Sequence, residues 1–245
     1  MAIELPKGIV KAEIQDPKNL IIFSKPKQGK STALAQLPDA LCIDLENGGY
    51  DYIDAVKVKA NSVQDIKEIC KAIKEANNPY KFIVLDTITA LEEMVKPLAL
   101  KLYLDTPAGS KFTGKNVLDA PMGQGYQKIR EAMEMVIEMV SKCAPNVILV
   151  CHTKDSAVAA DEINVKSIDL AGKSGRVLSS KYEAIGFLFR DDFSNTVLSF
   201  NTNDKFVECG ARPSHLRNKD VILGEMQENG EIIYHWERVF PSLEK

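Results

Sequence analysis

The sequence predicts an α/β fold in which a mostly parallel sheet is flanked by helices and followed by a β-rich C-terminal extension. Continuous apolar runs at 20–23, 82–85 and 146–151 have the pattern of strands that are buried on both faces. Segments with apolar residues at helical spacing, 62–76 and 125–143, lie between these strands. Strands that alternate with helices in this way form a parallel sheet with helices packed on its faces.

The remaining elements follow from local patterns. Helices are expected at 30–37 and 88–102, and a further buried strand at 40–45. Two polar segments without a clear period, 104–124 and 154–178, are expected to be long loops. Strand patterns separated by turn residues occur in the tail, at 184–189, 196–200, 221–223 and 232–236.

We expect a single domain with appended ends. A chain of 245 residues can bury a sizeable core. Residues 1–18 are expected to form an N-terminal arm or strand, 19–202 the α/β core, and 203–245 a β-rich extension of the same domain. No internal repeat, low-complexity linker or shift in composition marks another boundary.

A phosphate-binding loop opens the core. An apolar strand, a turn and the sequence GKST at 29–32 come in the order of the P-loop pattern G-x-x-x-x-G-K-[ST], with Ser24 in place of the first glycine. Gly29 lets backbone N–H groups approach phosphate, and Lys30 supplies a positive charge for the β- and γ-phosphates. A lysine-rich solvated turn is the alternative. The expected nucleotide contacts are Ser24, Lys25, Pro26, Lys27, Gln28, Gly29, Lys30, Ser31 and Thr32.

Acidic residues follow two later buried strands. Asp86 comes directly after four apolar residues, where a carboxylate without a partner is costly to bury. With the hydroxyl of Ser31 it is expected to hold Mg²⁺, and it can also cap the helix that follows. Glu46 and Asp44 lie on the same side of an extended strand end. Glu46, nearer the mouth, is our candidate for positioning water, Asp44 is its competitor, and a solvated acid pair is the alternative.

His152 ends the third apolar strand. A polar side chain at that point can sense a γ-phosphate by hydrogen bonding and pass its state to the following loop. A purely structural histidine is the alternative. His215 and His235 lack such a placement and are expected to be structural or on the surface.

Composition narrows the protein class. The 31 Lys and Arg against 34 Asp and Glu give a net charge of −3, which argues against a surface covered in basic residues. The five cysteines are scattered and never form a C-x-x-C pair, as expected for reduced thiols in a cytoplasmic protein. No apolar run approaches membrane-spanning length, so we expect no membrane partner.

The order of these motifs resembles that of RecA-type recombinases. The strand that carries Glu46 is similar to the family's strand with the catalytic glutamate, and 84–91 (VLDTITAL) resembles its Walker B strand. The strand that ends at His152 resembles the γ-phosphate-sensing strand, where the large recombinases have glutamine. The P-loop sequence SKPKQGKS, the DLENGG turn and the GAR stretch at 210–212 look more closely like small phage-encoded RecA-like ATPases, a group that includes single-strand annealing proteins. The resemblance covers residues 18–215.

This resemblance implies an ATPase that uses ATP and Mg²⁺, is stimulated by DNA, and acts on single-stranded DNA in phage recombination, by annealing or strand exchange. The protein would then work in the host cytoplasm. The two polar loops would hold the DNA, and ordinary solvated loops are the alternative. The candidate DNA contacts are Lys111, Lys115, Lys166, Lys173 and Arg176.

The resemblance also implies a homo-oligomer with ATP between subunits and a cation supplied by the neighbour. Arg212 is the first candidate for that cation, followed by Lys205 and Arg217. A single-strand DNA-binding protein is a further candidate partner. Two other functions stay open: an ATP-dependent assembly switch with little hydrolysis, and a helicase loader or motor subunit in DNA replication.

Overall fold

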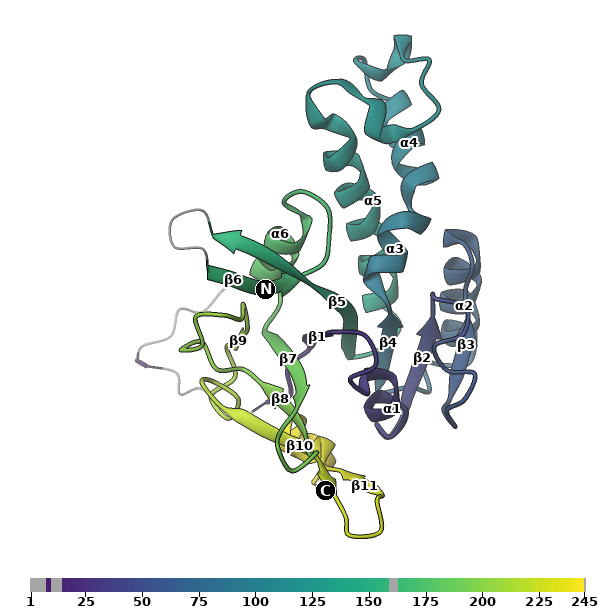
Figure 1. The fold of residues 1–245 in the computed structure, drawn as a ribbon. Helices are drawn as coiled ribbons and strands as arrows, with labels where there is room; N and C mark the ends of the chain where they lie inside the picture. Colours follow the sequence, from purple (N-terminus) through teal and green to yellow (C-terminus); the bar gives the residue numbers. More distant parts are fainter. Residues whose placement is uncertain (1–7, 10–14, 159–162, 245) are drawn as a thin grey trace.

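The computed structural model describes residues 8–9, 15–158 and 163–244, and the statements below concern these residues (Figure 1). Only part of the predicted N-terminal arm, 1–18, lies within them. The side chain of Asp16 accepts a hydrogen bond from the backbone N–H of Ser242 at 2.9 Å. Asp16, in the predicted arm, is therefore hydrogen-bonded to the C-terminal segment.

The described strands form one sheet with the order β11-β10-β8-β7-β1-β5-β4-β2-β3, in which β6 also pairs with β5 and β9 with β7. The five pairings from β7 across to β3 are parallel, and the others are antiparallel. The predicted α/β class is confirmed. The strands are β1 (Asn19–Ser24), β2 (Ala40–Asp44), β3 (Lys57–Lys59), β4 (Phe82–Asp86), β5 (Asn146–Val158), β6 (Ile163–Ile168), β7 (Ala184–Arg190), β8 (Thr196–Ser199), β9 (Gly210–Ala211), β10 (Asp220–Met226) and β11 (Ile232–Tyr234).

Helices cover both faces of the sheet. One core cluster joins the sheet to α2, α3, α4, α5 and α6, and a second joins its other face to α1 and the C-terminal segment. The apolar runs are continuous because successive side chains enter one cluster or the other. The helices are α1 (Lys30–Ala35), α2 (Val63–Glu75), α3 (Ile88–Met94), α4 (Lys96–Leu104), α5 (Gln124–Ser141) and α6 (Ser174–Lys181), with 3₁₀ turns η1 (Gly109–Lys111), η2 (Val117–Asp119), η3 (Pro121–Gly123), η4 (Trp236–Arg238) and η5 (Pro241–Leu243).

Two predicted elements differ from the structure. The single helix expected at 88–102 is divided into α3 and α4, which meet at Val95, and Pro97 stands in the first turn of α4. Proline fits a first helical turn because its missing N–H has no partner there in any case. The loop expected at 104–124 contains three 3₁₀ turns, at the far end of the α4–α5 pair (Figure 1).

The prediction of one long polar loop at 154–178 was wrong. β5 continues to Val158 and pairs antiparallel with β6, and α6 follows. This hairpin projects beside α6 in Figure 1. The alternation of apolar and polar residues in INVKSI at 163–168 is typical of a strand. β6 needs a partner from across the hairpin, and that pairing is a tertiary contact rather than a local pattern.

The C-terminal segment is packed onto the helix that follows the P-loop. The Trp236 ring is 2% exposed and its indole N–H donates to the backbone oxygen of Ala33 in α1, at 2.9 Å. It also stacks on Phe240, with 5.9 Å between ring centroids. None of the described helices has the length and apolar character needed to cross a membrane.

We expect Trp236→Ala to lower the free energy of unfolding by about 3–5 kcal/mol, because a buried aromatic side chain is lost and a cavity is left beside α1. Trp236→Phe keeps most of the buried area and loses the indole donor, so its expected cost is about 1 kcal/mol. Urea unfolding followed by circular dichroism measures both. Equal stability of Trp236→Ala and the wild type would show that the C-terminal segment does not support the core.

Candidate nucleotide-binding site

The P-loop lies at the carboxyl edge of the parallel strands, in the middle of the sheet. It connects β1 to α1, and β1 is paired with β5 on one side and β7 on the other. Gly29 precedes the helix with a φ of 91°, a left-handed conformation that favours glycine. Ser24, in contrast, is a strand residue without a positive φ. The first glycine of the pattern is therefore dispensable here.

Lys30 is folded back over the loop. The residue is 6% exposed, and its ammonium donates to Ser24 Oγ at 2.9 Å, to the Ser24 backbone oxygen at 3.3 Å and to the Lys25 backbone oxygen at 3.2 Å. Burial lowers the pKa of Lys30, while the nearby carboxylates of Asp86 and Glu46 oppose that effect. An incoming phosphate would give this buried cation a charged partner.

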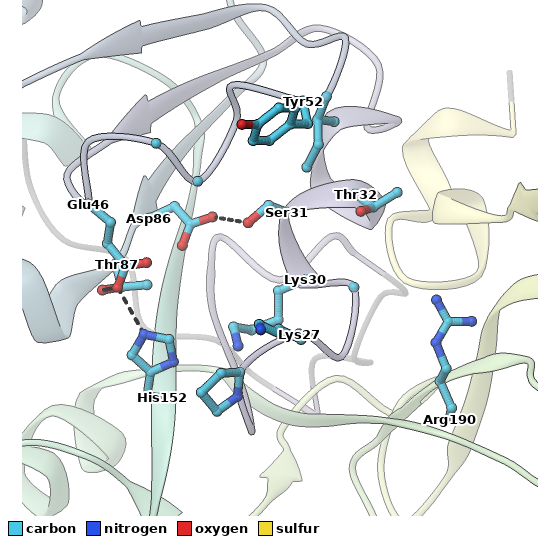
Figure 2. A pocket seen from close by; sticks show the side chains of 15 residues that line it. Lys27, Lys30, Ser31, Thr32, Glu46, Tyr52, Asp86, Thr87, His152 and Arg190 are labelled. Atoms are coloured by element: carbon cyan, nitrogen blue, oxygen red, sulfur yellow. Dashed lines mark hydrogen bonds and ion pairs between the residues drawn. The ribbon is translucent and has the colours of Figure 1, made fainter.

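Ser31 and Asp86 are brought together as expected. The Ser31 hydroxyl donates to Asp86 Oδ2 at 2.8 Å (Figure 2). The Tyr50 hydroxyl donates to the same oxygen at 2.9 Å. Asp86 is 4% exposed, and burial raises its pKa against the opposing effect of the two hydroxyls.

This donor set fits Mg²⁺. The ion prefers oxygen ligands and retains waters and substrate phosphates, so one carboxylate and one hydroxyl suffice from the protein. Across the described part of the chain, no three His, Cys, Asp or Glu side chains form a closed metal cage. Ser31 and Asp86 are thus the residues that would hold the ion.

The two acids at the end of β2 have different surroundings. Asp44 is 1% exposed, and its carboxylate accepts the backbone N–H groups of Glu46 at 3.0 Å and Gly48 at 3.2 Å. These bonds shape the turn. The Glu46 carboxylate instead lines the cavity, where Oε1 lies 2.8 Å from Thr87 Oγ1 and 2.9 Å from His152 Nε2. The geometry favours Glu46 over Asp44 as the residue that meets substrate water.

His152 is the last residue of β5 that pairs with β1, where its register partner is Ser24, so it lies next to the P-loop. Its Nε2 faces Glu46, as Figure 2 shows. The buried Nδ1 has no hydrogen-bond partner among the described residues. The ring thus contacts the candidate water-positioning carboxylate from the strand next to the P-loop.

Sequence reasoning missed several residues of this site, among them Thr87, Tyr50 and Arg190. The hydroxyl of Thr87 accepts the backbone N–H of Ala90 at the start of α3 and donates to the Glu46 carboxylate. Thr87 thus caps the helix and holds the Glu46 side chain. Tyr50 bonds Asp86, as described above. Arg190 lines the same cavity from the end of β7. A threonine before a helix is a readable capping signal, and Arg190 ends a strand at the same edge as the predicted residues.

The cavity framed by these residues has a volume of about 590 Å³. Its wall includes the P-loop on one side and the end of β2, β4 and β5 on the other. Of the predicted nucleotide contacts, the members of the lining are Pro26, Lys27, Gly29, Lys30, Ser31 and Thr32. Ser24 contacts it indirectly, through Lys30.

The candidate DNA contacts occupy two areas. Lys111 and Lys115 are exposed at the far end of the α4–α5 pair, whereas Lys166 lies on β6 with its ammonium 5.5 Å from the centre of the Phe187 ring. Lys173 and Arg176 are exposed at the start of α6. The two areas approach each other where Gly172 lies against the ring of Tyr126 in the first turn of α5.

Arg212 lies outside the cavity of its own chain. β9 pairs with the beginning of β7, at the sheet edge opposite the P-loop. The Arg212 guanidinium donates to the backbone oxygen of Ser180 at 3.0 Å. A role for Arg212 in the cavity of a neighbouring chain stays a prediction.

One of three comparisons with known proteins identifies a family for this chain. A family model described as an AAA domain matches residues 16–208. A search of curated proteins found no match. Among solved structures, a KaiC-like protein from the hyperthermophilic archaeon Pyrococcus horikoshii OT3 aligns over 90% of this chain and 90% of its own, with 13% identity and a TM-score of 0.49.

Proposed function

The chain belongs to the AAA-domain family and is a P-loop ATPase domain, and on that premise we propose that it hydrolyses Mg²⁺-ATP while bound to single-stranded DNA in phage recombination, by annealing or strand exchange. The observation that carries the ATP part is the convergence of Lys30, the Ser31–Asp86 pair and Glu46 on one cavity. Each of these groups matches one requirement of phosphoryl transfer to water.

Each residue has a separate task in this proposal. Lys30 and the backbone N–H groups of the P-loop bind the β- and γ-phosphates and offset their charge. Mg²⁺ held by Ser31 and Asp86 would stabilise negative charge on the phosphate oxygens. Glu46 orients the attacking water, because its carboxylate is fixed by Thr87 and His152 at the edge of the cavity. In this proposal, His152 exchanges its bond to Glu46 for one to the γ-phosphate.

The DNA part is supported by hydrogen bonds that lead from His152 to the segment between β6 and α6. The backbone oxygen of His152 accepts the N–H of Asp169 at 2.9 Å. Thr89 in α3 contacts both residues, since its Oγ1 lies 3.4 Å from the His152 nitrogen and 3.3 Å from the Asp169 oxygen. A displacement of His152 on γ-phosphate binding would therefore act directly on this segment.

A buried carboxylate holds the same segment against α3. Both oxygens of Glu92 lie 3.0 Å from the backbone nitrogen of Ala171, and Glu92 is 7% exposed. Burial raises the pKa of Glu92. Lys154, which lies in β5, donates to the backbone oxygen of Leu170. Residues 169–171 are thus attached to the two elements that border the ATP site, and they lead directly to Lys173 and Arg176.

Lys173→Ala combined with Arg176→Ala is expected to weaken binding of single-stranded DNA to a similar extent for all base sequences. Phosphate contacts carry no sequence information, and each one lost should reduce the slope of log K against log salt by about 0.7. Fluorescence anisotropy with labelled oligonucleotides at several salt concentrations measures this effect. ATP turnover without DNA should stay at the wild-type rate.

The matched control is Lys67→Ala with Lys71→Ala, which removes two exposed charges from α2, and α5 lies between α2 and α6 in Figure 1. Equal losses of DNA affinity in both double variants would reduce the effect to net charge. That result would contradict a DNA contact at the start of α6.

The proposal includes a homo-oligomer in which one chain faces the ATP site of the next. Arg212 and the P-loop lie at opposite edges of the sheet, so a head-to-tail contact would bring Arg212 toward a neighbouring cavity. A single-strand DNA-binding protein is the proposed further partner. ATP-dependent assembly with negligible turnover would instead favour the switch function.

A further inference from the structure

Arg190 is a cation in the wall of the cavity that the ATPase roles above leave unassigned. It is the last residue of β7, which pairs with β1 on the side away from β5. Its Nη2 lies 3.3 Å from the point that a Cβ on Gly29 would occupy. The guanidinium therefore stands directly against the backbone of the P-loop, and only a glycine at position 29 leaves this approach unhindered.

The position of the guanidinium is fixed by the turn that follows β7. Its Nη1 donates to the backbone oxygen of Ser194 at 3.0 Å. The carboxylate of Asp191, the nearest acid in sequence, is engaged elsewhere: it accepts the N–H groups of Phe193 at 2.9 Å and Asn195 at 2.8 Å, and the side-chain amide of Asn195 at 3.0 Å. Among the residues that the structure describes, no carboxylate forms an ion pair with Arg190.

The arrangement also indicates which part of a nucleotide meets Arg190. Glu46, Asp86 and His152 mark the γ-phosphate end, on the side of β2, β4 and β5. Arg190 lies across Lys30 from that group, on the side of Thr32, as Figure 2 shows. A triphosphate that places its γ-phosphate beside Glu46 must direct its nucleoside end toward Thr32 and Arg190.

We propose that Arg190 binds the α-phosphate of a nucleoside di- or triphosphate, an inference that rests on the proposed ATP site. A guanidinium pairs well with phosphate oxygens because its N–H groups form a planar fork. This contact is present in both the ATP and the ADP complex and is independent of the base. Arg190 accordingly contributes to nucleotide affinity, whereas Glu46 contributes to the hydrolysis step.

The test compares purified wild type, Arg190→Ala and Arg190→Lys by isothermal titration calorimetry without DNA. The ligands are Mg²⁺-ADP, a non-hydrolysable Mg²⁺-ATP analogue and the guanine counterparts of both. Arg190→Ala is expected to weaken all four by one common factor of about 10–100, the size of a lost hydrogen bond to a charged group. Arg190→Lys should recover part of that loss. Arg130→Ala, in α5 and outside the cavity, is the matched control with wild-type affinity.

Each of the other possible results contradicts either the contact with the α-phosphate or the ATP site itself. A loss restricted to the triphosphates would assign Arg190 to the γ-phosphate, and a loss that differs between adenine and guanine nucleotides would assign it to the base. Unchanged affinity with Arg190→Ala would overturn the inference and leave the ATP site intact. Absence of binding by the wild type would overturn the proposed function and this inference together. Thermal melts of each variant show whether a weak binder is folded.

Discussion

Glu46→Gln is expected to lower the turnover number for ATP hydrolysis by about 10²–10⁴-fold, the range typical of a lost acid–base group. ATP affinity should stay close to that of the wild type, because glutamine has the same shape and its amide oxygen can still accept from Thr87. What it cannot do is attract the proton of the attacking water. Steady-state phosphate release and equilibrium binding of a non-hydrolysable analogue measure the two quantities separately.

Asp44→Asn is the control for this prediction, since Asp44 lies two residues away at the same strand end. Its carboxylate bonds the N–H groups of Glu46 and Gly48, so its loss should mainly reduce thermal stability. Turnover near the wild-type level in Glu46→Gln, together with a large loss in Asp44→Asn, would reverse our assignment of the two acids.

Asp86→Asn is expected to have two opposite effects. ATP turnover should fall by about 10²–10³-fold, because a principal anchor for charge stabilisation at the phosphates is removed. The nucleotide-free protein should melt about 2–4 °C higher, which for a chain of this length corresponds to ~1 kcal/mol. The reason is that burial dominates the raised pKa of Asp86, so that its charge is unfavourable in the folded state.

The pH dependence of that stability difference follows from the direction of the shift. A carboxyl with a raised pKa binds its proton more strongly in the folded state, so it stabilises the fold fully below its unfolded pKa of about 3.9. That contribution is lost as pH rises through the folded pKa. The advantage of Asp86→Asn should therefore be largest at neutral pH and shrink on acidification. A lower melting temperature of Asp86→Asn at neutral pH would show that the bonds from Ser31 and Tyr50 outweigh the cost of burial.

The core of the fold was predictable from sequence because burial on both faces leaves an unmistakable apolar run. The strands at 20–23, 82–85 and 146–151 were confirmed, and so was the helix at 62–76, whose Ser62 cap accepts the N–H of Asp65 at 3.1 Å. The hairpin of β5 and β6 was missed because the pairing of its two strands is a tertiary contact that the local pattern at 163–168 does not reveal. The edge strand β3 (Lys57–Lys59) was missed because it has only three residues, two of which are exposed lysines.

The site was predictable to the extent that its residues stand at strand ends. Parallel strands bring their carboxyl ends to one edge, so positions 46, 86 and 152 were expected to meet, and the structure places them around the P-loop. Arg190 obeys the same rule at the end of β7 and was overlooked for lack of a motif. Tyr50 could not be found, because its bond to Asp86 spans 36 residues and depends on how the turn after β2 folds inward.

DNA-stimulated ATP turnover tests the central claim most directly. Phosphate release by the wild type should be Mg²⁺-dependent and should rise on addition of single-stranded DNA, with little rise in the Lys173→Ala/Arg176→Ala variant and negligible release by Glu46→Gln. Wild-type turnover that does not respond to single-stranded DNA would contradict the coupling between the ATP site and the segment before α6. Absence of turnover under all conditions, with ATP still bound, would contradict hydrolysis itself.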